Sequence, residues 1–396
     1  MEALDDILER YSVTDPSLDT DGKLLGASFV VLRNQEIVYS GSRGQRSLEP
    51  TARPWTADTF TWIASMTKLI TSTCLMQLVE AGKIGLDDDV RSLVPQLKAM
   101  QVLEGFDDAG KPLLRDNLDP ITLRILLTHA TGLPYDALSP DLQRWSKAVG
   151  RSASSADWTL EGFTTPLVFS PGTSWTYGTS IDWASLVLEA VTKDTLGTYF
   201  RQNIFEPLGM RHTGFFPLQL PHIADQVATW AYRDENGTGL STGEPWKTDT
   251  PAIESGGSGL HSTAADYARF LAGLLGGELV SSKTLDEMFR PQLDGAVATA
   301  LEQTAHSGGY VPEILAGTPL NHGLAGLINM ADMKGKRSAG SMMWTGAANG
   351  RWWIDRKTGV AGVLVVNVTP YGDKILEAMF DELEKTVYGS LLDGSN

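Results

Sequence analysis

The chain has 396 residues, of which 42% are hydrophobic, 20% are charged and 8% are aromatic. This balance is typical of an ordered globular protein, and the length exceeds what one hydrophobic core usually supports. Two lobes are therefore expected. The formal net charge of −16 argues against nucleic acid or an anionic membrane surface as a partner, because either would repel an acidic protein.

Few features of the sequence report on cellular location. The single cysteine, Cys74, excludes a framework of internal disulfides and is compatible with a reducing compartment. The first residues lack the basic and apolar regions of a signal peptide, and no apolar run approaches the roughly 18–20 residues of a membrane span. We therefore expect a cytoplasmic protein with no membrane partner.

The expected elements begin with a short amphipathic helix over 3–12 and a β-hairpin over 27–41. An extended segment at 59–62 leads into an amphipathic helix over about 65–81, which stops at Gly82. A polar region of loops and short helices starts at 86.

Helical patterns dominate from 121 to 209, with helices expected at 121–128 and 180–193, and a surface loop is expected at 234–250. Further helices are expected at 262–276, 282–289 and 372–391, with a second hairpin over 352–368. Strands at both ends and helices between them indicate one mixed lobe built from 1–85 and 250–396, and a mainly helical lobe over 86–249.

A serine and a lysine lie three residues apart in the segment 60–68, where the expected helix begins. At this spacing Ser65 and Lys68 share one helical face, one turn apart. A serine hydroxyl is a weak nucleophile until a nearby base activates it, and a lysine can supply that base. We interpret Ser65 as an acylatable nucleophile and Lys68 as its activator.

Several further segments resemble class C β-lactamases and the related family VIII carboxylesterases and penicillin-binding proteins. They follow that family's order along the chain and are Leu126–Leu133, Pro171–Tyr177, Pro207–Met210 and Gly257–Tyr267. Within this superfamily, 100–110 resembles the fungal acyltransferases of the lovastatin type. The resemblance implies a β-lactamase-like fold of mixed α/β (α+β) class. An antiparallel sheet flanked by helices would adjoin the helical lobe, with the active site between them.

The resemblance implies that Tyr177 is the second catalytic group. A phenol with a pKa near 10 is a useful base only if a neighbouring positive charge stabilises its phenolate, and Lys68 can supply that charge. The pair can take the proton of Ser65 during attack and return it to the leaving alkoxide. Which of the two is the formal base stays open, because their titrations are coupled.

The family's Lys-Thr-Gly motif falls at an unexpected place. The literal triplet 357–359 sits between two apolar strands and is predicted to be a turn. One strand earlier, 344–347 reads Trp-Thr-Gly-Ala, so Trp344 stands where the family has its lysine. An indole offers apolar surface and one N–H, and it cannot pair with the carboxylate of a β-lactam. We expect Trp344, Thr345 and Gly346 to bind substrate.

A second departure follows Tyr177, where the family's Tyr-x-Asn reads Tyr-Gly-Thr. Thr179 therefore occupies a substrate-binding position without the asparagine amide. Both departures favour neutral esters or thioesters over β-lactams. By the same resemblance, the backbone N–H groups of Ser65 and Ala347 are expected to form the oxyanion hole.

Other chemistries find less support. The chain has no Gly-x-Ser-x-Gly elbow, and no His-x-His or His-Glu-x-x-His cluster that would hold zinc. We therefore expect neither a metal nor a cofactor. A β-lactamase or D-Ala-D-Ala peptidase is disfavoured by Trp344 and Thr179. A catalytically silent ligand-binding relative is disfavoured because Ser65, Lys68 and Tyr177 occur together.

Hydrolysis and acyl transfer share the acyl-Ser65 intermediate and differ in whether water or an alcohol attacks it. We expect a serine carboxylesterase first, with an acyltransferase of a natural-product pathway as the alternative. The expected partner is a small-molecule ester or acyl donor, together with an alcohol acceptor in the transfer alternative. The sequence leaves the oligomeric state open.

Overall fold

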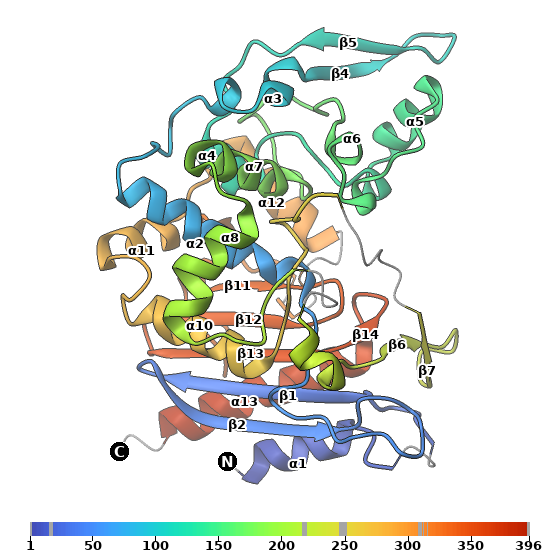
Figure 1. Cartoon of the computed structure of the whole chain (residues 1–396), viewed down its shortest axis with the longest axis vertical. Helices are drawn as coiled ribbons and strands as arrows, with labels where there is room; N and C mark the ends of the chain where they lie inside the picture. The colour runs from blue at the N-terminus through green and yellow to red at the C-terminus, as the bar shows by residue number, and fades with distance from the viewer. Residues whose placement is uncertain are drawn as a thin grey trace.

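The computed structural model describes residues 2–15, 19–215, 220–244, 252–307, 311, 313–314 and 316–393. Figure 1 shows a sheet with helices on both sides in the lower part of the molecule and a helix-rich region above it. Among the described helices, none combines the length and apolar character needed to cross a membrane.

A seven-stranded sheet organises the lower part of the molecule. Its spatial order is β2-β1-β13-β12-β11-β10-β9, and each neighbouring pair is antiparallel. The strands are β1 (Gly26–Arg33), β2 (Glu36–Gly44), β9 (Leu320–His322), β10 (Leu327–Asn329), β11 (Met342–Thr345), β12 (Arg351–Asp355) and β13 (Val360–Val366). Because β1 pairs with β13, the two ends of the chain build one sheet.

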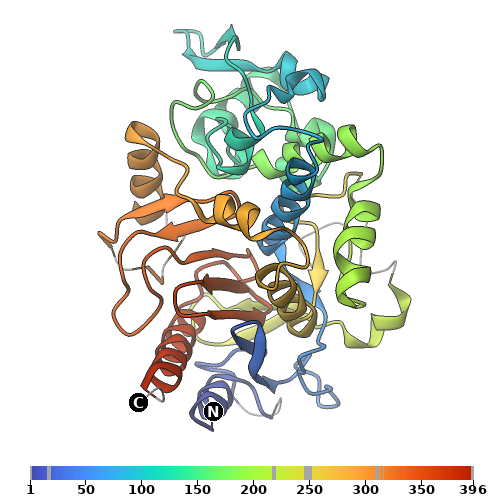
Figure 2. The same cartoon turned by 90° about the vertical axis from the view of Figure 1, so that its left-hand side faces the viewer.

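Helices cover both faces of this sheet, which explains why β13 is buried along its whole length. Figures 1 and 2 show α1 (Glu2–Tyr11) and α13 (Lys374–Asp393) on one face, and α10 (Ala264–Leu275) on the other with α2 (Thr67–Glu80). The mixed fold with an antiparallel sheet flanked by helices is therefore confirmed.

The upper region contains short helices and one hairpin. The hairpin of β4 (Gln101–Phe106) and β5 (Pro112–Asp116) lies at its far end (Figure 1). The remaining helices of the molecule are α3 (Pro95–Ala99), α4 (Leu123–Leu127), α5 (Pro140–Val149), α6 (Leu160–Phe163), α7 (Ser180–Thr192), α8 (Leu196–Phe200), α9 (Glu206–Leu208), α11 (Ser282–Phe289) and α12 (Gly295–Ser307).

Two segments that were expected to be loops or short helices contain strands, and the sequence did not predict α12 or the strands β9 to β11. The β4–β5 hairpin stands where loops and short helices were predicted, and most of its side chains are not fully buried, so the hydrophobic pattern there is weak. The loop predicted over 234–250 contains β7 (Leu240–Gly243); its residues 245–250 lie outside the described part. The predicted turn at 357–359 is confirmed, between β12 and β13.

Part of the segment 86–249 joins the lower sheet region. β6 (Trp230–Arg233) pairs with β7 and, in parallel, with β14 (Val368–Thr369). A further pair, β3 (Thr61–Trp62) with β8 (His261–Ser262), ties the residues before Ser65 to those after the Gly256-Gly257 turn. The division into 1–85 with 250–396, and 86–249, stays a prediction.

A buried ion pair holds α13 to the loop before β11. The guanidinium of Arg337 lies 2.7 Å from the carboxylate of Glu384, and both side chains are 0% exposed. Burial opposes ionisation of Glu384, but the charges and hydrogen bonds of Arg337 and Lys336 together outweigh it and lower the pKa of Glu384 below its usual value.

Removing one member of this pair should destabilise the fold strongly. We expect Arg337→Met to lower the free energy of unfolding by about 3–5 kcal/mol, because the carboxylate of Glu384 stays buried without its main partner. The double variant Arg337→Met with Glu384→Leu should recover most of that loss. Urea unfolding measures both. Lys385→Met, which breaks the exposed Lys385–Asp381 pair, is the control and should cost less than about 0.5 kcal/mol.

Candidate active site

Ser65 lies at a strained turn immediately before α2. The chain leaves β3, makes a 3₁₀ turn over Ala64–Met66 and enters the helix at Thr67. Ala64 has φ +46°, a left-handed conformation that is unfavourable for a residue with a side chain. Thr67 Oγ1 donates to the Ala64 carbonyl at 2.6 Å and supports the turn. This geometry sets Ser65 at the helix N-terminus, as its sequence position predicted.

Lys68 is a buried ammonium group that donates to acceptors from different segments. Its side chain is 2% exposed. Nζ donates to Ser65 Oγ at 3.2 Å, to Tyr135 Oη at 3.1 Å and to the Gly257 carbonyl at 2.8 Å. These bonds compensate for the loss of water around a buried charge.

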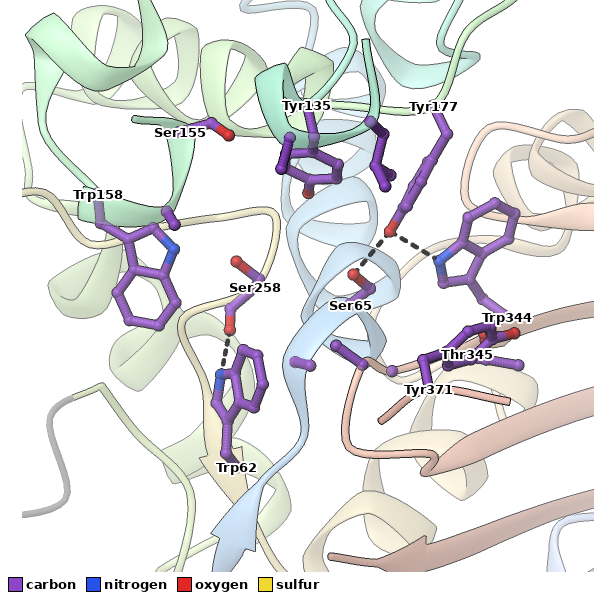
Figure 3. A pocket seen from close by; sticks show the side chains of 16 residues that line it. Trp62, Ser65, Tyr135, Ser155, Trp158, Tyr177, Ser258, Trp344, Thr345 and Tyr371 are labelled. Atoms are coloured by element: carbon purple, nitrogen blue, oxygen red, sulfur yellow. Dashed lines mark hydrogen bonds between the residues drawn. The ribbon is translucent and has the colours of Figure 1, made fainter. Parts of the chain in front are cut away.

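The phenol of Tyr177 contacts the same serine. Tyr177 Oη donates to Ser65 Oγ at 2.6 Å (Figure 3), and the Lys68 ammonium lies 4.7 Å from the centre of the Tyr177 ring. Ser65 Oγ therefore has a phenol and an ammonium group within hydrogen-bond reach. The structure brings together the three residues that the sequence selected for catalysis.

The segment carrying Tyr177 is fixed by pairing with residues 129–135. Thr176 N donates to the His129 carbonyl and Thr179 N to the Leu133 carbonyl. A Cβ at Gly178 would lie 2.0 Å from the Leu133 carbonyl oxygen, so only glycine permits this approach. Gly178 is therefore required because the chain packs too closely against Leu133 for a side chain at this position.

Tyr135 belongs to the site and was missed by the sequence analysis. It accepts a hydrogen bond from Lys68, and its ring meets that of Tyr177 edge-on with centroids 5.3 Å apart. Burial, with a smaller contribution from the charge of Tyr177, raises the pKa of Tyr135 well above its usual value. The sequence signal was weak, because Tyr135 lies just beyond the segment Leu126–Leu133 that carries the family resemblance.

Trp344, which is part of β11, lies beside Tyr177. Its indole N–H donates to Tyr177 Oη at 3.3 Å, and the two ring centroids are 5.0 Å apart (Figure 3). The residue that replaces the family's lysine thus directs its one polar hydrogen at the phenol. The sequence position predicted contact with substrate, but not this hydrogen bond.

Gly346 brings the end of β11 close to the nucleophile. A Cβ at Gly346 would lie 2.5 Å from the Ile63 carbonyl oxygen, so glycine is needed where the strand passes the turn before Ser65. Thr345, Gly346 and Ala347 all line the cavity that contains Ser65. Thr345 Oγ1 is also hydrogen-bonded to Tyr371 Oη at 3.0 Å.

Thr179, the remaining residue predicted to bind substrate, lies outside the lining of this cavity as the described residues define it. It is 2% exposed, precedes the first turn of α7, and is not among the described residues that line the cavity. The expected substrate contact at Thr179 therefore has no support from its position.

The cavity in front of Ser65 has a volume of about 420 Å³. Trp62 and Trp158 stand on one side of Ser65, and Trp344 and Tyr371 on the other (Figure 3). The described lining residues are all uncharged: Trp62, Ala64, Ser65, Tyr135, Ala137, Leu138, Ser155, Ala156, Trp158, Tyr177, Ser258, Trp344, Thr345, Gly346, Ala347 and Tyr371. Such a lining suits a neutral, largely apolar ligand.

Two buried histidines pack behind Tyr177 and Trp344. The His129 ring meets Tyr177 edge-on at 5.0 Å and stacks on Trp344, and His322 meets Trp344 edge-on at 5.7 Å. Burial lowers the pKa of His129 well below its usual value and that of His322 to about 4. Both rings are therefore neutral at pH 7.

Within the described residues, no group of three or more His, Cys, Asp or Glu could hold a metal ion.

Acid should destabilise the folded protein through His322. The unfolded chain protonates this histidine near pH 6.5, whereas the folded protein does so only near pH 4. Between these values the unfolded state binds more protons, so stability is highest above pH 6.5 and falls by about 3 kcal/mol towards pH 4.

Urea unfolding at several pH values should show a shallower acid dependence for His322→Gln than for the wild type. His222→Gln, at an exposed position, serves as the control and should follow the wild type. If the stability of His322→Gln fell with pH as steeply as that of the wild type, His322 would not be the source of the acid destabilisation.

The chain matches a known protein family and several characterised relatives. A family model described as Beta-lactamase matches residues 5–384. The lovastatin esterase of Penicillium rubens is 34% identical over 360 residues, which cover 88% of this chain and 89% of that protein. The monacolin J acid methylbutanoyltransferase of Aspergillus terreus is 33% identical over 353 residues, or 86% and 84% of the two chains.

A solved structure agrees with these relatives. A mutant of simvastatin synthase from Aspergillus terreus superposes with a TM-score of 0.87 at 31% identity, covering 94% of this chain and 92% of that one. The resemblance drawn from the sequence motifs is confirmed, including the likeness to lovastatin-type enzymes. The chain belongs to the β-lactamase family, and its relatives include esterases and acyltransferases.

Proposed function

We propose that this chain is a serine carboxylesterase or acyltransferase that acts through an acyl-Ser65 intermediate. The observation that carries the proposal is the 2.6 Å hydrogen bond between Tyr177 and Ser65, with Lys68 Nζ 3.2 Å from the same oxygen. In its reactive form the pair holds one proton fewer, as a phenolate beside an ammonium or a phenol beside an amine, so it can take the proton of Ser65 as the serine attacks.

In the first step Ser65 Oγ attacks the carbonyl carbon of the ester. Its proton passes to the pair formed by Tyr177 and Lys68, and the electron pair of the carbonyl moves to oxygen. A phenolate at Tyr177 is stabilised by the nearby ammonium of Lys68 and by the indole N–H of Trp344.

The oxyanion is proposed to sit between the backbone N–H groups of Ser65 and Ala347. Ser65 lies at the N-terminus of α2, where peptide dipoles favour negative charge, and Ala347 lines the same cavity. Donors fixed in this way typically contribute roughly 3–4 kcal/mol each to the transition state. The contact uses backbone atoms, so an alanine is compatible with the role.

Collapse of the tetrahedral species breaks the bond to the leaving alkoxide, which takes the proton back from the pair. Water or an acceptor alcohol then attacks the acyl group and gives its proton to the same pair, which returns it to Ser65 Oγ as the bond between that oxygen and the acyl carbon breaks. Both outcomes use the same residues. Esterase activity is our first assignment, and the acyltransferases among the similar proteins support transfer to a natural-product alcohol as the second.

The substrate is proposed to be a neutral ester or thioester. The cavity lining carries no charged side chain among its described residues, and Trp344 cannot pair with a carboxylate as a lysine would. A β-lactam or peptide C-terminus therefore lacks its usual cationic partner in this cavity. The proposed partners are a small-molecule acyl donor and, for transfer, an alcohol. The proposed location is the cytoplasm.

Ester turnover and its loss in variants test the mechanism. We expect p-nitrophenyl butyrate to be hydrolysed far faster than a chromogenic cephalosporin. Ser65→Ala should reduce kcat by at least about 10³-fold, and Tyr177→Phe by about 10²–10⁴-fold, because the nucleophile or its proton acceptor is lost. Mass spectrometry should find the acyl group on Ser65. Full activity in Ser65→Ala, or an adduct on another residue, would contradict the proposal.

An acceptor alcohol separates hydrolysis from transfer. With p-nitrophenyl butyrate as donor and a bulky polycyclic alcohol as acceptor, an acyltransferase should form the new ester at the expense of free butyrate. Since both products come from one intermediate, Ser65→Ala should abolish both. Chromatography of the two products gives their ratio. Free butyrate as the sole product across a series of acceptors would leave esterase as the function.

A further inference from the structure

A turn at residues 255–258 lies between α2 and α7, next to Lys68. From α2, Thr71 Oγ1 donates to the Gly256 carbonyl at 2.6 Å, and Lys68 Nζ donates to the Gly257 carbonyl at 2.8 Å. One of the three acceptors of the Lys68 ammonium is therefore a backbone carbonyl, and the direction of that carbonyl depends on what holds the turn.

Asp182 holds the turn from the other side. It lies in the first turn of α7 and is 1% exposed. Its Oδ1 accepts from Ser255 Oγ at 2.5 Å and from Gly257 N at 3.0 Å. Gly257 thus has its N–H on the Asp182 carboxylate and its carbonyl on the Lys68 ammonium.

The two glycines of the turn allow this close approach. A Cβ at Gly257 would lie 2.4 Å from Asp182 Oδ2, and one at Gly256 would lie 2.5 Å from Ser185 Cβ. Any larger residue would push the turn away from α7 and displace the acceptor of Lys68. Because both residues are glycines, the Asp182 carboxylate and the Lys68 ammonium can bind the N–H and the carbonyl of the same residue, Gly257.

The charge of Asp182 is also felt inside the site. Burial, followed by the charges of Tyr177 and Asp182, raises the pKa of Tyr135, the second phenol on Lys68. A buried ammonium is costly unless a nearby negative charge or several hydrogen bonds compensate for its lost hydration. A carboxylate one residue of backbone away supplies such a charge.

We propose that Asp182 is a positioning residue for Lys68: it aims the Gly257 carbonyl at Nζ and offsets the buried ammonium charge. The inference rests on the proposed function, in which that ammonium supports the Tyr177 phenolate. Among the described residues, the other titratable groups shown to interact with Lys68 are Tyr135, Tyr177 and His129.

The variant Asp182→Asn separates the charge of Asp182 from its hydrogen bonds. An asparagine oxygen can still accept from Ser255 and Gly257, so the turn keeps its shape while the charge disappears. We expect kcat for p-nitrophenyl butyrate to fall about tenfold or more with little change in KM. The alkaline limb of the pH profile should move to lower pH, because the protonated form of the site loses a nearby negative charge.

Ser255→Ala is the matched control, since it removes one hydrogen bond to Asp182 but leaves the charge. It should alter kcat by less than Asp182→Asn does and leave the alkaline limb in place. An Asp182→Asn enzyme with wild-type kcat and pH profile would overturn the inference. If the wild type itself formed no acyl-Ser65, the proposed function would fail instead, so the two failures are distinguishable.

A stability cycle with Lys68→Met covers the case in which Asp182→Asn folds poorly. Each single variant leaves one buried charge without its counterpart, so each should lower Tm. The double variant Lys68→Met with Asp182→Asn should unfold at a higher temperature than additive losses predict. Additive losses in Tm, including failure of the double variant to fold, would overturn the inference.

Discussion

The buried ammonium of Lys68 is the constraint around which the site is assembled. A cation with so little contact with water requires acceptors, and they come from Ser65 in the turn just before α2, from Tyr135 and from the Gly257 carbonyl. Tyr135 and Gly257 are far from Lys68 in the chain. Satisfying one charge therefore fixes the relative position of α2, the loop after α4 and the turn before β8.

The surroundings of Tyr177 make that charge effective. His129, Tyr135 and Trp344 pack their rings against the phenol, and burial keeps the histidine neutral. In such a water-poor setting, the attraction between the Lys68 ammonium and a phenolate is stronger than it would be in solvent. The aromatic residues thus contribute to proton transfer without exchanging protons themselves.

The sequence predicts those site residues that a local spacing or a family motif marks, and it misses those defined by contacts between distant segments. Ser65 and Lys68 were predictable because a three-residue spacing on a helix fixes a shared face, and Tyr177 because the family motif carries it. Tyr135 and Asp182 were not, since each acts through a contact between segments that no local pattern encodes. The β4–β5 hairpin was missed for a related reason: its partly exposed strands show little alternation, so pairing within the hairpin defines it.

The replacement of the family's lysine by Trp344 has two separable consequences. It removes the cation that would hold a substrate carboxylate, and the rest of the cavity lining supplies no other charge among the described residues. It also keeps a hydrogen-bond donor on Tyr177, through the indole N–H. A donor without a charge can still stabilise a phenolate, although less than a cation does. One substitution can thus redirect the cavity towards neutral esters while the proton acceptor of Ser65 is retained, and it leaves Lys68 as the cation on which that acceptor depends.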